Sequence, residues 1–454
     1  MTVLAVLVAA VIAEGSFGVY SPDGKRIAYQ ADRGGLTEIA VKDLASGAVT
    51  WVSEGPGEGL YPAWGRDGAV IYTYGHETGT AYGNRKERRK GGYNLFRWKS
   101  GKSHRLTQGR SRDYLASVSP DGSVLYTTTK GMESSLPAQM IRDKLVRRVK
   151  GGATEDVRVP MQANGGVHSA SVSPDGKTLV WTEVRMLRDI WRICAAPIDR
   201  AATTQPCFLT PDDSPSYAPR WSPDGKSICY TACKEGDPGW CVYVQDLATG
   251  DEYRICEGRH PAFSPDGKRL LYDREGELHE IGWTRGDGRR FAGRPAKADA
   301  NFTHYRVDVT VKPGTDYGNS RHDVVANALP VFSVRGTGGD NQKLVFSLRN
   351  GRPMFRSEDK GGAGANTFMS EPSPQGTNFT FTCVRGDHTL SIYRNGRLEA
   401  ARWYPAGLVP IEGSAEPVLE RSDALVTANL SYGKGVPDDL EKPLVRTELF
   451  GGMK

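Results

Sequence analysis

Along the first two-thirds of the chain, short apolar runs alternate with polar turns, and one turn string recurs. Five copies read Ser-Pro-Asp-Gly, beginning at Ser21, Ser119, Ser173, Ser222 and Ser264, and a sixth reads Gly65-Arg-Asp-Gly68. An apolar run follows each copy: RIAYQ, VIYTY, VLYTT, TLVWTE, SICYT and RLLYD. In such a turn, proline presets φ, aspartate accepts a hydrogen bond from its own backbone, and glycine takes a positive φ. Each copy therefore predicts strands on either side of a tight turn.

The spacing of these copies predicts the architecture. The turn aspartates are Asp23, Asp67, Asp121, Asp175, Asp224 and Asp266, separated by 44, 54, 54, 49 and 42 residues. A period of about 40 to 50 residues with strand-like flanks is typical of β-propeller blades. A further strand and polar turn often follow, as in EIAVKDLASG and CVYVQDLATG, so the repeat amounts to a four-stranded unit.

These strings resemble the WD40-like PD40 repeats of TolB-type propellers. The resemblance implies an all-β, six-bladed β-propeller over residues 14–290, although Gly65-Arg66 departs from the motif in the second copy. Such propellers serve as binding platforms, as gates on peptidases and as lyases. The resemblance therefore predicts an architecture rather than one activity.

After Trp283 the pattern changes, and the turn string no longer occurs. Residues 291–300 are predicted to be a linker, and alternating strands follow within 301–454. The segment HTLSIYRNGRLEAARW, with Asn395-Gly396 as a two-residue turn, resembles the hairpin of concanavalin A-like and laminin-G-like domains. The resemblance implies a C-terminal β-sandwich, and Ca²⁺ in this domain is the one cofactor it suggests.

The first thirteen residues, MTVLAVLVAAVIA, are apolar without interruption. This length is too short to span a bilayer and suits the apolar core of a signal peptide, so we predict an exported protein: periplasmic, cell-surface or secreted. The alternative is a first β-strand. No other segment approaches the length of a transmembrane helix.

Cysteine usage supports export. Six of the seven cysteines lie between Cys194 and Cys256, without zinc-knuckle spacing, so no metal site is predicted. Local disulfides are the favoured interpretation, for example Cys233 with Cys241 or Cys194 with Cys207. Buried free thiols are the alternative.

Candidate binding residues lie four or five positions before each turn string, where a propeller opens around its axis. They are Tyr61, Tyr114, His168, Tyr217, Arg259 and His260, with Asp113 beside Tyr114. Arginine pairs with carboxylates, and histidine or tyrosine moves protons, so this set suits an acidic sugar. The alternative is that such positions are aromatic or polar in propellers of every function.

A basic loop in the second repeat is a separate candidate. It carries Arg85, Lys86, Arg88, Arg89 and Lys90, which would attract an anionic ligand such as a uronic or sulfated glycan. A solvated loop without a partner is the alternative. The net charge of +6 is modest for 454 residues and gives no reason to expect nucleic acid.

The sequence contains no nucleophile elbow, zinc-protease motif, phosphate-binding loop or dinucleotide fingerprint. We therefore expect an exported, non-enzymatic binding protein of the cell envelope that recognises carbohydrate or protein. The alternative is a polysaccharide lyase acting on an acidic glycan at the propeller mouth.

Overall fold

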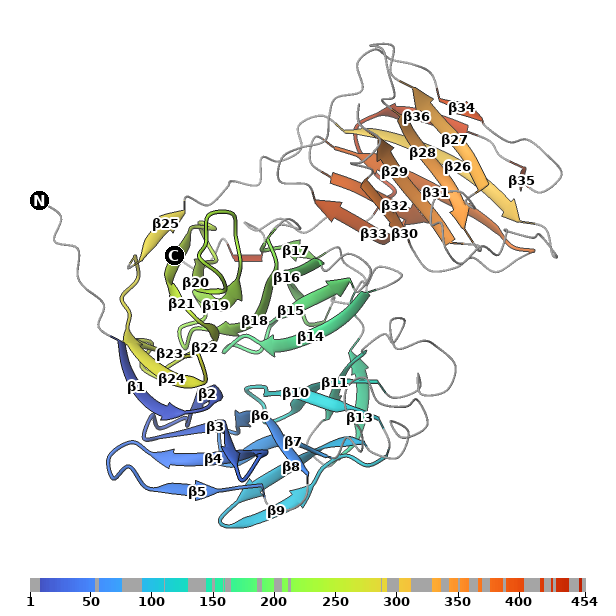
Figure 1. Cartoon of the computed structure of the whole chain (residues 1–454). Helices are drawn as coiled ribbons and strands as arrows, with labels where there is room; N and C mark the ends of the chain where they lie inside the picture. The colour runs from blue at the N-terminus through green and yellow to red at the C-terminus, as the bar shows by residue number, and fades with distance from the viewer. Residues whose placement is uncertain are drawn as a thin grey trace, which may run out of the picture.

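The structure is a computed structural model of the whole chain. It describes residues 9–53, 57–75, 92–109, 111–129, 144–148, 152–157, 159, 165–185, 190–199, 206–210, 214–286, 288–291, 302–311, 329–335, 343–349, 352–358, 366–369, 376–386, 389–403, 417–419, 426–427, 430–440 and 449–450. Most of the described residues lie in β-strands, and turns and irregular segments connect them (Figure 1).

The described strands between residues 9 and 291 form six antiparallel sheets that follow one another along the chain. The first contains β2 (Ser16–Tyr20), β3 (Arg26–Arg33), β4 (Leu36–Asp43) and β5 (Val49–Trp51). The second contains β6 (Glu58–Trp64), β7 (Val70–Gly75), β8 (Tyr93–Lys99) and β9 (Lys102–Arg105). The third contains β10 (Asp113–Val118), β11 (Val124–Thr128), β12 (Lys144–Arg148) and β13 (Thr154–Val157).

The remaining three sheets follow the same plan, with two additions. The fourth contains β14 (Gly165–Val172), β15 (Thr178–Arg185), β16 (Ile190–Pro197) and β17 (Cys207–Phe208). The fifth contains β18 (Ser216–Trp221), β19 (Ser227–Ala232), β20 (Cys241–Asp246) and β21 (Glu252–Glu257), and β25 (Arg289–Phe291) joins it as a fifth strand. The sixth contains β22 (Arg259–Phe263), β23 (Arg269–Arg274), β24 (Glu277–Gly282) and, from the start of the chain, β1 (Ala9–Glu14).

The first strands of the six sheets contact one another in a closed cycle. β2 contacts β6, β6 contacts β10, and so on through β14 and β18 to β22, which returns to β2. This arrangement is that of a β-propeller, because each sheet packs against its two neighbours around a common axis.

The predicted turns form as the residue types require. At the first copy, the Ser21 hydroxyl donates to Asp23 Oδ1 (2.5 Å), the same oxygen accepts the Lys25 N–H (3.1 Å), and Gly24 has φ of +70°. The Arg26 N–H in turn donates to Ser21 Oγ (2.9 Å), which joins the turn to the next strand. The second copy lacks the serine hydroxyl, and there Asp67 Oδ1 accepts the Ala69 N–H (3.2 Å).

Strand β1 closes the sixth sheet. It pairs antiparallel with β24 from Ala9 opposite Ile281 to Glu14 opposite Glu277 (Figure 1). The Lys42 ammonium donates to the Ile12 carbonyl (2.6 Å), which fastens the strand to the first sheet as well. Of the segment predicted to be signal-peptide-like, residues 1–8 lie outside the described residues, and the rest adopts the alternative, a first strand.

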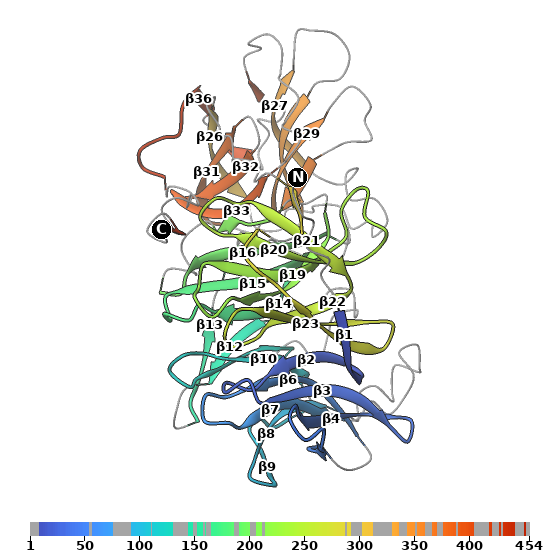
Figure 2. The ribbon, with the colours of Figure 1, turned by 90° about the vertical axis from the view of Figure 1, so that its left-hand side faces the viewer.

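The strands after residue 302 make two further sheets, a group distinct from the six (Figure 2). One contains β26 (Thr303–Val311), β31 (Asn378–Arg385), β32 (Thr389–Arg394), β33 (Arg397–Trp403), β35 (Val426–Thr427) and β36 (Leu430–Lys434). The other contains β27 (Leu329–Arg335), β28 (Lys343–Arg349), β29 (Arg352–Glu358), β30 (Asn366–Met369) and β34 (Val418–Leu419). Most of the linker predicted at 291–300 lies outside the described residues.

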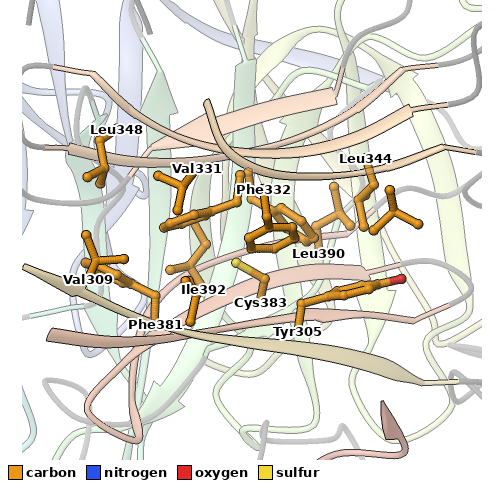
Figure 3. Close-up of a cluster of buried hydrophobic side chains, with 14 residues drawn as sticks. Tyr305, Val309, Val331, Phe332, Leu344, Leu348, Phe381, Cys383, Leu390 and Ile392 are labelled. Carbon is orange, nitrogen blue, oxygen red and sulfur yellow. The ribbon is translucent and has the colours of Figure 1, made fainter. Parts of the chain in front are cut away.

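These two sheets share one apolar core (Figure 3). Phe381 and Ile392 of one sheet meet Phe332 and Leu348 of the other, and all four side chains are fully buried. The hairpin between β32 and β33 turns at Asn395-Gly396 as predicted, with φ of +51° and +81°. The backbone therefore adopts the left-handed conformation at both turn positions, which asparagine and glycine accept more readily than other residues.

The seven cysteines all lie in described segments, and none of them forms a disulfide. The prediction of local disulfides is therefore wrong for this structure. Strand register is the reason. Cys241 lies opposite Ala232 and Cys194 opposite Phe208, so neither cysteine faces the partner proposed for it.

Candidate functional site

Each first strand of the propeller is interrupted by a β-bulge at the same place. The register shifts, and within or beside each shift one non-glycine residue has φ near +50°: Phe17, Tyr61, Leu115, Ser169, Ala218 and His260. Each lies six positions before a turn aspartate. A left-handed conformation costs a residue with a side chain about 1–2 kcal/mol, so the surrounding structure must hold it.

Polar side chains on the second strand of each preceding sheet support these bulges. The Phe17 N–H donates to Asp273 Oδ1 (3.1 Å), and the Tyr61 N–H donates to Gln30 Oε1 (2.9 Å). Two threonines act in the same way: Thr182 accepts the Ala218 N–H (3.2 Å) and Thr231 accepts the His260 N–H (2.9 Å). At the other two junctions, the donors are threonine hydroxyls and the acceptors backbone carbonyls: Thr73 with Asp113 O (3.3 Å) and Thr127 with Val167 O (3.2 Å). Each sheet is therefore bonded to the next around the cycle.

Substituting Thr182 by valine is expected to lower the free energy of unfolding by about 1–3 kcal/mol, because the buried Ala218 N–H loses its acceptor while side-chain volume is kept. Urea denaturation measures the change. Thr50→Val, at an exposed strand position, is the matched control and is expected to change stability by less than about 0.5 kcal/mol. Equal stabilities for the two variants would contradict the role given to Thr182.

Aromatic side chains at the bulges, together with Trp191 on β16, form a second closed cycle, here called the aromatic cycle. Centroid distances are 4.9 Å for Phe17–Tyr61, 6.3 Å for Tyr61–Tyr114, 5.6 Å for Tyr114–His168, 5.7 Å for His168–Trp191, 5.7 Å for Trp191–Tyr217, 5.6 Å for Tyr217–His260 and 3.6 Å for His260–Phe17. All seven rings are half-buried. The cycle therefore presents a continuous, partly exposed aromatic surface where the six first strands meet.

The sequence predictions located most of this surface. The structure brings together five predicted residues, Tyr61, Tyr114, His168, Tyr217 and His260, and places exposed Arg259 beside them. Phe17 was missed, although it lies at the same offset from its turn string. Trp191, at the start of β16, and Trp240, in the loop before β20, were missed because their positions follow no repeat.

His260 is held by a buried carboxylate. Its Nδ1 lies 2.9 Å from Asp273 Oδ1, the oxygen that also accepts the Phe17 N–H, and its ring stacks on Phe17. Asp273 is 8% exposed. Among the described residues no hydrogen bond involves His260 Nε2, so that nitrogen is the one placed to meet a ligand.

The two histidines have different partners. His168 Nε2 lies 3.4 Å from the Tyr114 hydroxyl, whereas His260 is paired with Asp273. In the aromatic cycle, Trp191 and Tyr217 lie between the two histidine rings.

Burial raises the pKa of Tyr217 to about 12, and the Asp273 carboxylate adds to the rise, while the nearby Arg259 guanidinium opposes it. Tyr217 is therefore a hydroxyl donor at neutral pH rather than a base. Because its folded-state pKa exceeds the unfolded value, the stability linked to this proton is present below pH 10 and is lost as the pH rises from about 10 to about 12.

The wild-type protein is expected to lose more thermal stability between pH 9 and pH 11 than Tyr217→Phe, which lacks this ionisation. Differential scanning calorimetry at the two pH values measures both losses, and their difference isolates Tyr217 from the other tyrosines. Identical losses would show that Tyr217 titrates normally.

The predicted basic loop lies in a part of the chain that the structure does not describe. Arg85, Lys86, Arg88, Arg89 and Lys90 lie outside the described residues. Within the described segments, no group of three or more histidine, cysteine or acidic side chains is arranged to hold a metal ion. Nor does any helix there have the length and apolar character needed to cross a membrane.

Comparison with known proteins supports the repeat assignment. No protein-family model matches the chain. An uncharacterized protein of Agrobacterium fabrum is 40% identical over 80 residues, which cover 16% of this chain and 26% of that protein. The Tol-Pal system protein TolB of Francisella tularensis is 39% identical over 66 residues, covering 14% of this chain and 15% of TolB. The propeller is TolB-like.

The chain thus aligns with about a quarter or less of the length of these curated relatives. Among solved structures, TolB from Acinetobacter baumannii matches 63% of this chain and 56% of its own, at 17% identity and a TM-score of 0.37. Oligogalacturonate lyase from Vibrio parahaemolyticus matches 60% and 79%, at 14% identity and a TM-score of 0.41. Trypanosoma rangeli sialidase matches 96% and 93%, at 12% identity and a TM-score of 0.41. The identification of a TolB-like propeller therefore rests on the repeats and the sheet topology.

Proposed function

We propose that the chain is an exported binding protein of the cell envelope that recognises carbohydrate at the aromatic cycle. In this proposal residues 9–291 are a six-bladed TolB-like propeller, and the C-terminal sheets are a concanavalin/laminin-G-like sandwich that adds a second recognition surface. The observation that carries it is the half-buried aromatic surface, flanked by Arg259. Ligand sites characteristically combine aromatic walls with a few polar groups that fix orientation.

Binding of a glycan array by the purified protein tests this proposal. Trp191→Ala is expected to weaken binding of any glycan bound by the wild type about tenfold, because Trp191 bridges His168 and Tyr217 in the cycle. Trp51→Ala is the matched control: Trp51 is also half-buried in the propeller but lies on the outer strand β5. The carbohydrate proposal is wrong if no glycan on the array is bound, or if the two substitutions weaken binding equally. A protein partner would then be favoured.

A second candidate is a polysaccharide lyase that acts on an acidic glycan. It is favoured by one observation, the Asp273-oriented His260 beside Tyr217 and Arg259. His260 would take the proton from C5 of a uronate. As the C4–O bond breaks and a C4–C5 double bond forms, Tyr217 would return a proton to the leaving oxygen. Ultraviolet absorbance of the unsaturated product tests it: product formation that His260→Ala abolishes supports the lyase, and absence of product from every uronate glycan bound excludes it.

A further inference from the structure

Arg259 differs in its partners from Arg254 and Arg269, the arginines before and after it in the chain. It is exposed, and among the described residues no carboxylate lies within salt-bridge distance of it. By contrast, Arg254 pairs with Asp237 (2.9 Å) and Arg269 with Glu280 (3.1 Å). An exposed guanidinium beside a ligand surface is suited to binding a planar anion through two parallel hydrogen bonds.

Trp240 holds this guanidinium. The Arg259 Cζ lies 5.4 Å from the centroid of the Trp240 ring, a cation–π contact, and the Trp240 ring meets the Tyr217 ring edge-on at 5.1 Å. The main chain makes a second link, because the Gly258 N–H donates to the Trp240 carbonyl (2.9 Å). The position of Arg259 relative to the aromatic cycle therefore depends on the position of Trp240.

Trp240 ends the loop 233–240 between β19 and β20, and Asp237 fixes the shape of that loop. The Asp237 carboxylate is 1% exposed. It accepts hydrogen bonds from the Lys234 N–H (2.8 Å), the Tyr243 hydroxyl (2.9 Å) and the Arg254 guanidinium (2.9 Å). The Asp237 N–H also donates to the Lys234 carbonyl (3.0 Å), which closes a turn. One buried carboxylate therefore binds the loop to both neighbouring strands, β20 and β21.

We propose that Asp237 is a positioning residue that keeps Trp240 and Arg259 at the aromatic cycle, where Arg259 binds the carboxylate of an acidic sugar. This inference rests on the proposed carbohydrate function and narrows its ligand class to hexuronates. The sugar ring lies against the aromatic cycle, and the guanidinium pairs with the C6 carboxylate. Esterification of that carboxylate removes the charge while keeping the ring.

The test compares tetrasaccharides of glucuronate and galacturonate with their methyl esters, by isothermal titration calorimetry on the full chain. The wild type is expected to bind at least one acid about tenfold or more tightly than its ester, since a hydrogen bond to a charged group contributes about 1.5–3 kcal/mol. Arg259→Met is expected to abolish this preference, because the acid loses more affinity than the ester does. Arg33→Met is the control, because Arg33 stacks on Trp51 (5.0 Å) in the same way but away from the cycle.

The positioning role is tested by Asp237→Asn and, in case that variant does not fold, by Tyr243→Phe, which removes one of the three donors. Both are expected to reduce the acid-over-ester preference at least threefold, whereas a residue needed only for folding would lower the melting temperature and leave the preference intact. The outcomes separate the two proposals. If neither acid nor ester binds, the carbohydrate function fails. If both bind equally, or Arg259→Met keeps the preference, only the hexuronate inference fails.

Discussion

Replacing Arg192 with methionine is expected to lower the free energy of unfolding by about 3–5 kcal/mol, the cost of leaving a buried charge without its partner. Arg192 and Glu183 lie opposite each other on β16 and β15, with Nε and Oε2 2.5 Å apart and side chains only 2% and 3% exposed. Arg192 also stacks over Phe208 (3.9 Å), and methionine keeps much of that apolar contact. Urea denaturation measures the loss.

A double variant separates charge from packing. Glu183→Gln combined with Arg192→Met removes both charges, and it is expected to recover most of the lost stability. Arg274→Met is the surface control, because Arg274 and Glu257 are each 47% exposed and 3.9 Å apart, and its effect is expected to stay below about 0.5 kcal/mol. If Arg192→Met matches this control, or the double variant is no more stable than the single one, the account of this ion pair is wrong.

Deleting Ala9–Glu14 is expected to lower the melting temperature by about 10 °C, because the sixth sheet loses strand β1. Each backbone hydrogen bond lost costs about 1 kcal/mol, and five residue pairs join β1 to β24. The half-buried Ile12 and Ala13 also leave the cluster that contains Leu271 and Leu278. Thermal unfolding followed by circular dichroism measures the shift.

The control is Val11→Ser, which keeps the strand and alters a side chain that is 55% exposed. Its melting temperature is expected to stay within about 2 °C of the wild type. An unchanged melting temperature on deletion would show that β1 is dispensable. The experiment also bears on the signal-peptide prediction. Cleavage after Ala13 would remove most of β1, whereas the sixth sheet contains β1 only if Ala9–Ala13 remain in the protein.

The features that sequence predicted best were those encoded locally. A turn string fixes its own hydrogen bonds, as Ser21 and Asp23 do, and Asn395-Gly396 specifies its hairpin through backbone conformation. The offset from each turn located the aromatic cycle for the same reason, since the bulge always lies six residues before the turn aspartate.

The features that sequence missed depend on register and on loop paths. Clustering of cysteines in the sequence suggested disulfides, yet the pairing of β16 with β17 places Cys207 opposite Ala195 rather than Cys194. Trp191, in β16, and Trp240, in the loop before β20, share no common spacing from the turn strings. Asp237 is one of 53 acidic residues, and only its burial among three donors distinguishes it.

The bulges also determine the symmetry of the aromatic cycle. In the sixth, first and second sheets, the ring belongs to the left-handed residue itself: His260, Phe17 and Tyr61. In the third, fourth and fifth sheets, it belongs to the residue before: Tyr114, His168 and Tyr217. Six equivalent strands thus produce two unlike halves in place of sixfold rotational symmetry. A ligand at the centre can consequently be bound in one distinct orientation. A ring with sixfold symmetry would bind it equally well in six orientations.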